Sequence, residues 1–253
     1  MISYLSHNRR KRFQRGVAAF DIFGNRSRGF NGVDDYIDLG DSDDFSFGDG
    51  SNDSPFSVSA WIKMEDASQF RILTKFNISS TEQEWQFSFG SDNKLYFSLY
   101  GDNGASRLTR GTSMTFNSLE GQWVHVTATY DGSSSSSGIK IYKTEQDGLT
   151  VRVDASTFNI GSYTSMHNTS ASAIIGRLGD WTGGTSYADG NIADVRLYDA
   201  ELSSLDISNL YNGTNITTDL IGHWLIDSDD VIDHAGTNDG TNFGSVYSTD
   251  SPS

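Results

Sequence analysis

Four short phrases of the same build recur along the chain, and they constrain its fold more than any other feature. They are residues 30–40 (FNGVDDYIDLG), 56–63 (FSVSAWIK), 122–132 (QWVHVTATYDG) and 189–203 (DGNIADVRLYDAELS). In each phrase, alternating apolar residues adjoin a turn rich in glycine or aspartate, as in a strand that leaves a tight hairpin. The pattern predicts an all-β fold built from antiparallel strands.

The composition is typical of one β-sandwich with a large core. Of the 253 residues, 36% are hydrophobic and 12% aromatic, which argues against a disordered chain. No run approaches the roughly 18 consecutive apolar residues of a membrane-spanning helix. Cysteine is absent, so disulfides contribute nothing and stability must come from the core.

The four phrases together resemble the laminin-G-like, concanavalin A-like family of jelly-roll domains, which includes lectins, pentraxins and carbohydrate-binding modules. The resemblance covers roughly residues 29–244. It implies a two-sheet antiparallel jelly-roll sandwich with one short helix. We expect an extended N-terminal arm over residues 1–28, a jelly-roll domain over 29–246 with its closing strand at the C-terminal end, and a tail over 247–253.

One helix and one displaced strand are expected near the C-terminal end. Ser203 stands before Asp206 in the spacing of a capping box, which predicts a helix over residues 202–211. Residues 220–244 look like the opening strand and loop of the family, which normally precede the first phrase. Their position favours a circular permutation, because the ends of a sandwich lie close together. A truncated second repeat is the alternative.

The N-terminal segment differs in charge from the rest of the chain. The formal net charge is −15, yet residues 1–30 hold seven basic residues and one acidic residue. Residues 1–16 lack the apolar stretch of a signal peptide. We expect a basic arm that anchors the domain to an acidic surface of a larger assembly, with a solvated tail as the alternative and nucleic acid disfavoured as a partner. The expected anchor residues are Arg9, Arg10, Lys11, Arg12, Phe13 and Arg15.

The sequence lacks the patterns of the common catalytic sites. Jelly-roll glucanases place acidic residues on one strand as E-x-D-x-x-E, and none of the six glutamates begins that pattern. Glu82 and Glu84 come nearest, but Trp85 and Gln86 follow them. The five histidines show no zinc-ligand spacing, and His125 is expected to be a structural core residue. We therefore expect no enzymatic activity, with a glycan-degrading hydrolase or lyase as an alternative.

Aspartate-rich loops make calcium the expected cofactor. Ca²⁺ binds roughly six to eight oxygens from carboxylates, amides and main-chain carbonyls. Many laminin-G-like and pentraxin domains bind calcium, so the resemblance implies it here. The expected ligands are Asp34 and Asp35 in the first phrase. The alternative is that the acidic loops only keep the surface hydrated.

A glycan site needs an exposed aromatic ring beside polar groups for the sugar hydroxyls. Four tryptophans lie in strand patterns and are expected in the core: Trp61, Trp85, Trp123 and Trp224. Trp181 instead lies in a glycine-rich loop, GDWTGG. The expected glycan-binding residues are Trp181, Asp180 and Tyr187, with Tyr100 and Asn103 in a second region. The alternative is that Trp181 folds back as a lid on the core.

These features combine into a non-catalytic, lectin-like protein with a structural and binding role. We expect a virion component, such as a phage capsid decoration or tail-associated protein, assembled in the host cytoplasm. Its expected partners are other capsid or tail subunits, further copies of itself and host-surface glycan, with no membrane. The alternatives are a free, extracellular carbohydrate-binding or adhesion module and a purely structural protein.

Overall fold

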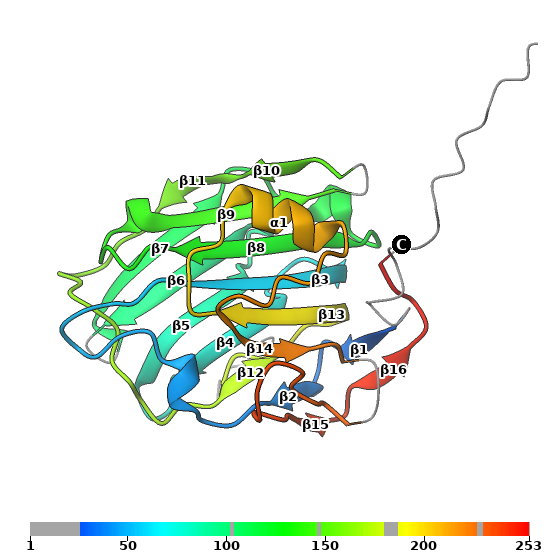
Figure 1. Ribbon diagram of the computed structural model, residues 1–253, viewed down its shortest axis with the longest axis horizontal. Helices are drawn as coiled ribbons and strands as arrows, with labels where there is room; N and C mark the ends of the chain where they lie inside the picture. Colours follow the sequence, from blue (N-terminus) through cyan, green and yellow to red (C-terminus); the bar gives the residue numbers. More distant parts are fainter. Residues whose placement is uncertain (1–25, 102–103, 146–147, 180–186, 227–229, 253) are drawn as a thin grey trace, which may run out of the picture.

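The protein folds into two eight-stranded antiparallel sheets packed face to face (Figure 1). The computed structural model describes residues 26–101, 104–145, 148–179, 187–226 and 230–252. Two β-layers with one short α-helix confirm the predicted jelly-roll sandwich. The expected anchor residues of the arm, from Arg9 to Arg15, lie outside the described residues.

The first sheet has the strand order β10-β9-β8-β3-β13-β1-β16, with β14 also paired to β13. Its strands are β1 (Ser27–Asn31), β3 (Phe56–Asp66), β8 (Val124–Tyr130), β9 (Ile139–Thr144), β10 (Thr150–Arg152), β13 (Asp189–Tyr198), β14 (Leu220–Trp224) and β16 (Val246–Ser248). Three of the four phrases supply its adjacent strands β8, β3 and β13.

The second sheet has the strand order β11-β7-β6-β5-β4-β12-β2-β15. Its strands are β2 (Tyr36–Asp38), β4 (Arg71–Asn77), β5 (Glu82–Phe89), β6 (Leu95–Gly101), β7 (Ser106–Thr112), β11 (Asp154–Thr157), β12 (Ala173–Ile175) and β15 (Thr241–Phe243). Short 3-10 turns lie in the connections: η2 (Asp43–Phe45), η4 (Asn117–Leu119) and η5 (Ser136–Gly138). Strands β4 to β7 follow one another as neighbouring hairpins and lie side by side in the sheet (Figure 1).

Aromatic side chains join the two sheets. The ring of Phe56 on β3 stacks on Phe47 with centroids 4.0 Å apart. It also contacts Trp85 of β5 and Phe97 of β6, at centroid distances of 5.6 and 5.2 Å. All four side chains are buried, and burying each one contributes about 1.5–3 kcal/mol or more. Contacts between β3 and the middle strands of the second sheet therefore form the centre of the core.

The predicted core tryptophans are buried, but they belong to different clusters. Trp85 and Trp224 lie in the core between the sheets. Trp61 and Trp123 lie in a separate cluster with Tyr211, which comes from the helix. Strand β3 is consequently buried on both faces over most of its length.

The helix α1 (Ser204–Tyr211) lies over the outer face of the first sheet (Figure 1). Its predicted capping box is present, because Ser203 accepts from the backbone of Asp206 while the Asp206 carboxylate accepts from the backbone of Ser203. Ile207 and Leu210 are its buried apolar residues together with Tyr211. Among the described residues, no helix has the length and apolarity needed to cross a bilayer.

Buried polar side chains fill the outer face of the first sheet near this helix. The Ser59 hydroxyl and the His125 imidazole are hydrogen-bonded at 2.8 Å between β3 and β8. Asp194 of β13 forms an ion pair with Arg196 at 2.9 Å and a hydrogen bond with His223 at 2.7 Å. Burial lowers the pKa of His125 to about 4. The buried, hydrogen-bonded position of His125 supports the structural role expected for it.

The C-terminal segment extends both sheets. Strand β14 pairs with β13, β15 pairs with β2, and β16 pairs with β1. Beyond β16, the Asp250 carboxylate accepts a hydrogen bond from the Trp123 indole at 2.8 Å and pairs with Lys63. The domain boundaries expected after residues 28 and 246 thus fall within β1 and at the start of β16. The described tail packs on the domain, and the permutation itself stays a prediction.

Burial of His125 predicts a specific loss of stability in acid. Because its pKa is depressed in the folded protein, the unfolded chain binds a proton first as the pH falls below about 6.5. The stability present above that pH is therefore lost progressively down to about pH 4. Between about pH 7 and pH 4.5, wild type should lose about 2 kcal/mol more unfolding free energy than His125→Gln. Urea unfolding of both proteins at both pH values measures this; equal losses would contradict a neutral, buried His125.

Candidate functional site

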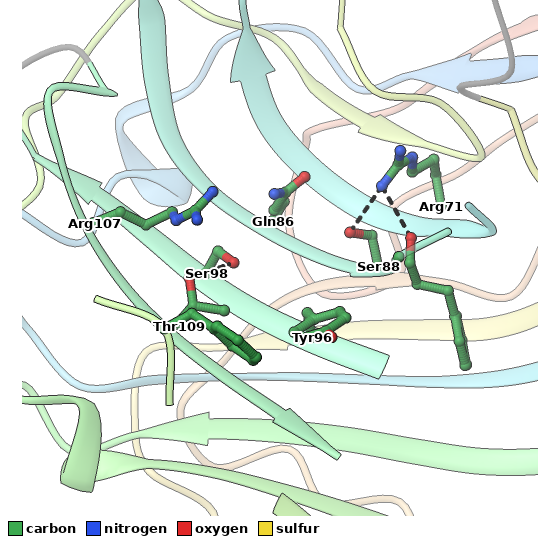
Figure 2. Close-up of a pocket in the computed structure, with 10 residues that line it drawn as sticks. Arg71, Gln86, Ser88, Tyr96, Ser98, Arg107 and Thr109 are labelled. Carbon is green, nitrogen blue, oxygen red and sulfur yellow. Dashed lines mark hydrogen bonds between the residues drawn. The ribbon is translucent and has the colours of Figure 1, made fainter. Parts of the chain in front are cut away.

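A pocket of about 280 Å³ opens on the outward face of the second sheet, and we call it the β4–β7 pocket (Figure 2). Its polar lining comes from four neighbouring strands: Arg71 from β4, Gln86 and Ser88 from β5, Tyr96 and Ser98 from β6, and Arg107 and Thr109 from β7. Phe158, which follows β11, completes one side. The size is close to the lower end of ligand sites in proteins, roughly 300–1,000 Å³.

The pocket exists because side chains alternate across the sheet. On β5, Trp85 and Phe87 point into the core, so Gln86 and Ser88 point outward. Register places Gln86 opposite Ser98, and Ser98 opposite Thr109. The Thr109 hydroxyl donates to Ser98 at 2.9 Å, which gives the pocket an ordered hydroxyl floor.

Two arginines stand at opposite ends of the pocket, with Gln86 between them (Figure 2). Arg71 donates to the Ser88 hydroxyl at 3.2 Å and to the Phe89 carbonyl at 3.1 Å. Burial lowers its pKa to about 10, so the guanidinium remains charged at neutral pH. The Arg107 guanidinium lies 5.7 Å from the centroid of the Tyr100 ring, within cation–π range.

Gln86 has one occupied and one free hydrogen-bonding atom. Its Nε2 donates to the hydroxyl of Tyr100. Its Oε1 has no hydrogen-bond partner among the described residues. Tyr100 is only 5% exposed, since it packs with Phe76 and Leu178, and it contacts both Gln86 and Arg107. The expected glycan-binding Tyr100 therefore lies next to the pocket without offering an open ring face.

Tyr96 and Phe158 form the aromatic side of the pocket. Their rings meet at an angle of 65° with centroids 6.0 Å apart, and Phe158 is 48% exposed. The Tyr96 hydroxyl donates to Asp92 at 2.8 Å. Burial and this carboxylate raise the pKa of Tyr96 to about 12, so its hydroxyl stays protonated at neutral pH. The Tyr96 ring lies directly over Gly111 of β7, where an added Cβ would overlap it. Only glycine leaves room for the ring at this position.

The remaining glycan-binding residues expected from the sequence do not line this pocket where they can be placed. Trp181, Asp180 and Asn103 lie outside the described residues. Tyr187 is half-buried and forms a β-bridge with Arg177 just before β13. The involvement of these four residues in a glycan site stays a prediction.

The expected calcium ligands have a structural task in the turn between β1 and β2. Asp35 accepts a hydrogen bond from the backbone of Asn31 at 3.0 Å, and Asp34 accepts one from the Asn31 side chain at 2.8 Å. Burial raises the pKa of Asp35, which is 6% exposed. Within the described ranges, no three acidic or histidine side chains gather as a metal site would need. Calcium at Asp34 and Asp35 stays a prediction.

The nearest sequence match to a catalytic pair is also structural. Glu84 is buried, accepts a hydrogen bond from the backbone of Thr169 at 2.8 Å, and lies 3.3 Å from the Lys75 ammonium. Glu82 accepts hydrogen bonds from two serines at the surface. The described residues that line the β4–β7 pocket include no aspartate, glutamate or histidine. The pocket thus offers groups for binding and lacks the carboxylate pair of a glycosidase.

The main residues of the pocket were not singled out from the sequence. Arg71, Gln86, Tyr96 and Arg107 come from four strands and have no common motif. Their signal is weak, because each is a polar residue at an alternate position of a strand. Only the pairing of β4 with β5, and of β6 with its two neighbours, brings them together.

The close fit of Tyr96 over Gly111 predicts a strong steric coupling. Gly111→Ala should cost about 1–3 kcal/mol of unfolding free energy, because the new methyl group meets the ring. In the background Tyr96→Ala the same substitution should cost much less, which a double-mutant cycle by urea unfolding measures. Gly29→Ala on β1 is the matched control, since its methyl group would make only ordinary contacts. Equal costs of Gly111→Ala in both backgrounds would show that the ring lies elsewhere.

Several solved structures align with this chain. Among solved structures, a Bacteroides ovatus protein provisionally named a carbohydrate-binding protein aligns with a TM-score of 0.58 and 18% identity, over 88% of this chain and 59% of that protein. A heptameric SAP-like pentraxin from Limulus polyphemus aligns with a TM-score of 0.49 and 17% identity, over 86% and 95%. Mouse laminin α1 domains LG4-5 align with a TM-score of 0.43 and 14% identity, over 68% and 40%.

The sequence comparisons point to one family. No curated protein sequence matched the chain. Residues 31–208, however, match the family model of the concanavalin A-like lectin/glucanases superfamily, which covers β2 to β13 and most of α1. The match spans more than half of the chain and both sheets. The chain therefore belongs to the concanavalin A-like lectin/glucanase superfamily.

Proposed function

We propose that this protein is a non-catalytic carbohydrate-binding protein that holds a saccharide in the β4–β7 pocket. The observation that carries the proposal is the aromatic pair Tyr96 and Phe158 beside outward-pointing polar groups of the same sheet. Sugars present apolar C–H faces to aromatic rings and hydroxyls to hydrogen-bonding groups. The pocket offers both within one hollow.

The polar groups match the requirements of hydroxyl recognition. The Thr109 hydroxyl donates to Ser98 at 2.9 Å, which leaves the Ser98 hydroxyl free to donate and the Thr109 oxygen free to accept a further hydrogen bond. Gln86 Oε1 is an acceptor without a partner among the described residues. A sugar hydroxyl would supply that missing donor, and an unmade hydrogen bond at a buried atom otherwise costs about 1–3 kcal/mol.

The family and the neighbouring structures support binding rather than catalysis. Superfamily members include lectins as well as glucanases, as the family description states. The Bacteroides ovatus protein named for carbohydrate binding shares the fold, although this chain spans only 59% of its length. Within the pocket, the protonated Tyr96 is a poor base, and the described lining offers no carboxylate for acid catalysis.

Glycan-array binding tests the proposal directly. Tyr96→Ala and Phe158→Ala should each weaken glycan binding about tenfold or more, because each removes an apolar platform. Tyr247→Ala, an exposed aromatic on β16 outside the pocket, is the control and should bind as wild type does. Binding that survives both pocket substitutions but disappears in Trp181→Ala would move the site to the glycine-rich loop. Repeating the array with and without calcium tests the metal prediction.

An assembly role extends the same proposal. The basic arm, with Arg9, Arg10, Lys11, Arg12 and Arg15, would tether the acidic domain to a larger particle by charge attraction. On this proposal the particle is a virion and the domain displays its pocket outward.

Deletion of residues 1–16 tests the tether. The shortened protein should keep its thermal unfolding midpoint, because the deleted residues precede β1, and should no longer co-sediment with the native particle. Co-sedimentation that persists after the deletion would rule out the arm as the tether. Full-length protein with these five basic residues changed to Gln is the matched control for charge.

A further inference from the structure

The β4–β7 pocket contains positive charge that no described carboxylate neutralises. Arg71 and Arg107 line the pocket, and neither forms a salt bridge within the described part of the chain. Three other strand arginines differ in this respect: Arg110 and Arg152 pair with Asp154, and Arg196 pairs with Asp194. In a protein with a formal net charge of −15, two such arginines in one hollow stand out.

Asp92, the acidic residue that contacts the pocket residue Tyr96, already has partners of its own. The Asp92 carboxylate accepts a hydrogen bond from the Tyr96 hydroxyl at 2.8 Å and lies 3.6 Å from the Lys94 ammonium. Arg71 uses its Nη1 on neutral oxygens of Ser88 and Phe89, which do not balance its charge. A largely buried guanidinium without a counter-ion is unfavourable, so an anion in the pocket would be stabilised.

The arginines are spaced for a ligand with separated groups. Arg71 and Arg107 lie on β4 and β7, three strand spacings or roughly 14 Å apart across the sheet. Register sets Gly111 in line with Arg71, so Arg107 also lies four residues, roughly 13 Å, farther along β7. Gln86 lies between them in Figure 2, and the Ser98 hydroxyl lies beside it. A ligand that fits this arrangement carries an anionic group for an arginine and hydroxyls for Gln86 and Ser98. An acidic sugar chain has both kinds of group.

We propose that the β4–β7 pocket selects an acidic saccharide, whose carboxylate or sulfate groups bind Arg71 and Arg107 while Gln86 Oε1 accepts a hydrogen bond from a sugar hydroxyl. The proposal rests on the carbohydrate-binding function proposed above and narrows its ligand class. Guanidinium groups bind planar carboxylates and sulfates through paired N–H donors, more strongly than neutral groups do. Neutral sugars would leave both charges uncompensated.

Titration calorimetry with chemically matched probes tests this selectivity. The first pair is oligogalacturonate and its methyl ester, and the second is a heparan sulfate oligosaccharide and its desulfated form. At least one acidic member should bind at least about tenfold more tightly than its neutral counterpart. The preference should shrink as salt increases, since the pocket is open to solvent. Inorganic sulfate serves as the competitor and should not displace the saccharide at equal concentration.

Substitutions locate the preference. Arg71→Gln and Arg107→Gln should each reduce the acidic-over-neutral preference about tenfold, and Arg71→Lys should restore only part of it because the paired donors are lost. Arg152→Gln, on β10 and outside the pocket, removes the same charge and should change nothing. Circular dichroism verifies that each variant is folded.

The outcomes separate the two proposals. Equal binding of acidic and neutral probes that is lost in Tyr96→Ala would overturn the acidic selectivity and leave carbohydrate binding intact. An acidic preference that persists in the Arg71→Gln/Arg107→Gln double variant would also overturn it, as would full displacement by inorganic sulfate. Absence of binding to every glycan on the array would overturn both.

Discussion

The aromatic contacts of Phe56 across the interior determine what both faces of the protein can do. Phe56 reaches from the first sheet to Trp85 and Phe97 in the second, and it stacks on Phe47 from the connection after η2. Because β5 and β6 commit alternate residues to this core, their other residues must point outward. The polar pocket is thus a direct consequence of how the sandwich is held together.

The outward-pointing residues are covered on one sheet and uncovered on the other. On the first sheet, α1 covers the outward residues, so polar groups such as His125 and Arg196 are buried and satisfied by neighbours. On the second sheet, no described helix covers β4 to β7, and Arg71 and Gln86 remain open to a partner. The buried network stabilises the fold, whereas the open groups line the pocket that we propose for recognition.

The sequence allowed the fold to be predicted, but not the β4–β7 pocket. The period-two alternation and the capping box of Ser203 are local signals, and they correctly indicated the strands of the four phrases and α1. The pocket depends on register between strands, which one sequence does not reveal. Tyr100 was expected to bind glycan in a second region, yet its ring is buried and its hydroxyl accepts a hydrogen bond from Gln86. The glycine-rich loop around Trp181 lies outside the described residues, so its part in recognition stays open to experiment.

The pairing of β1 with β16 has a mechanical consequence. Ser27 lies opposite Ser248 in an antiparallel register, so the two described ends of the chain leave from one edge of the first sheet (Figure 1). Tension between those ends would unzip this ladder one residue pair at a time, with little resistance. Tension between the arm side and a ligand on β4 to β7 would instead pull the two sheets against each other and load the whole aromatic interior at once. A domain that is held by its N-terminal arm and pulled through a ligand on β4 to β7 would therefore resist unfolding far better than a domain that is pulled by both chain ends.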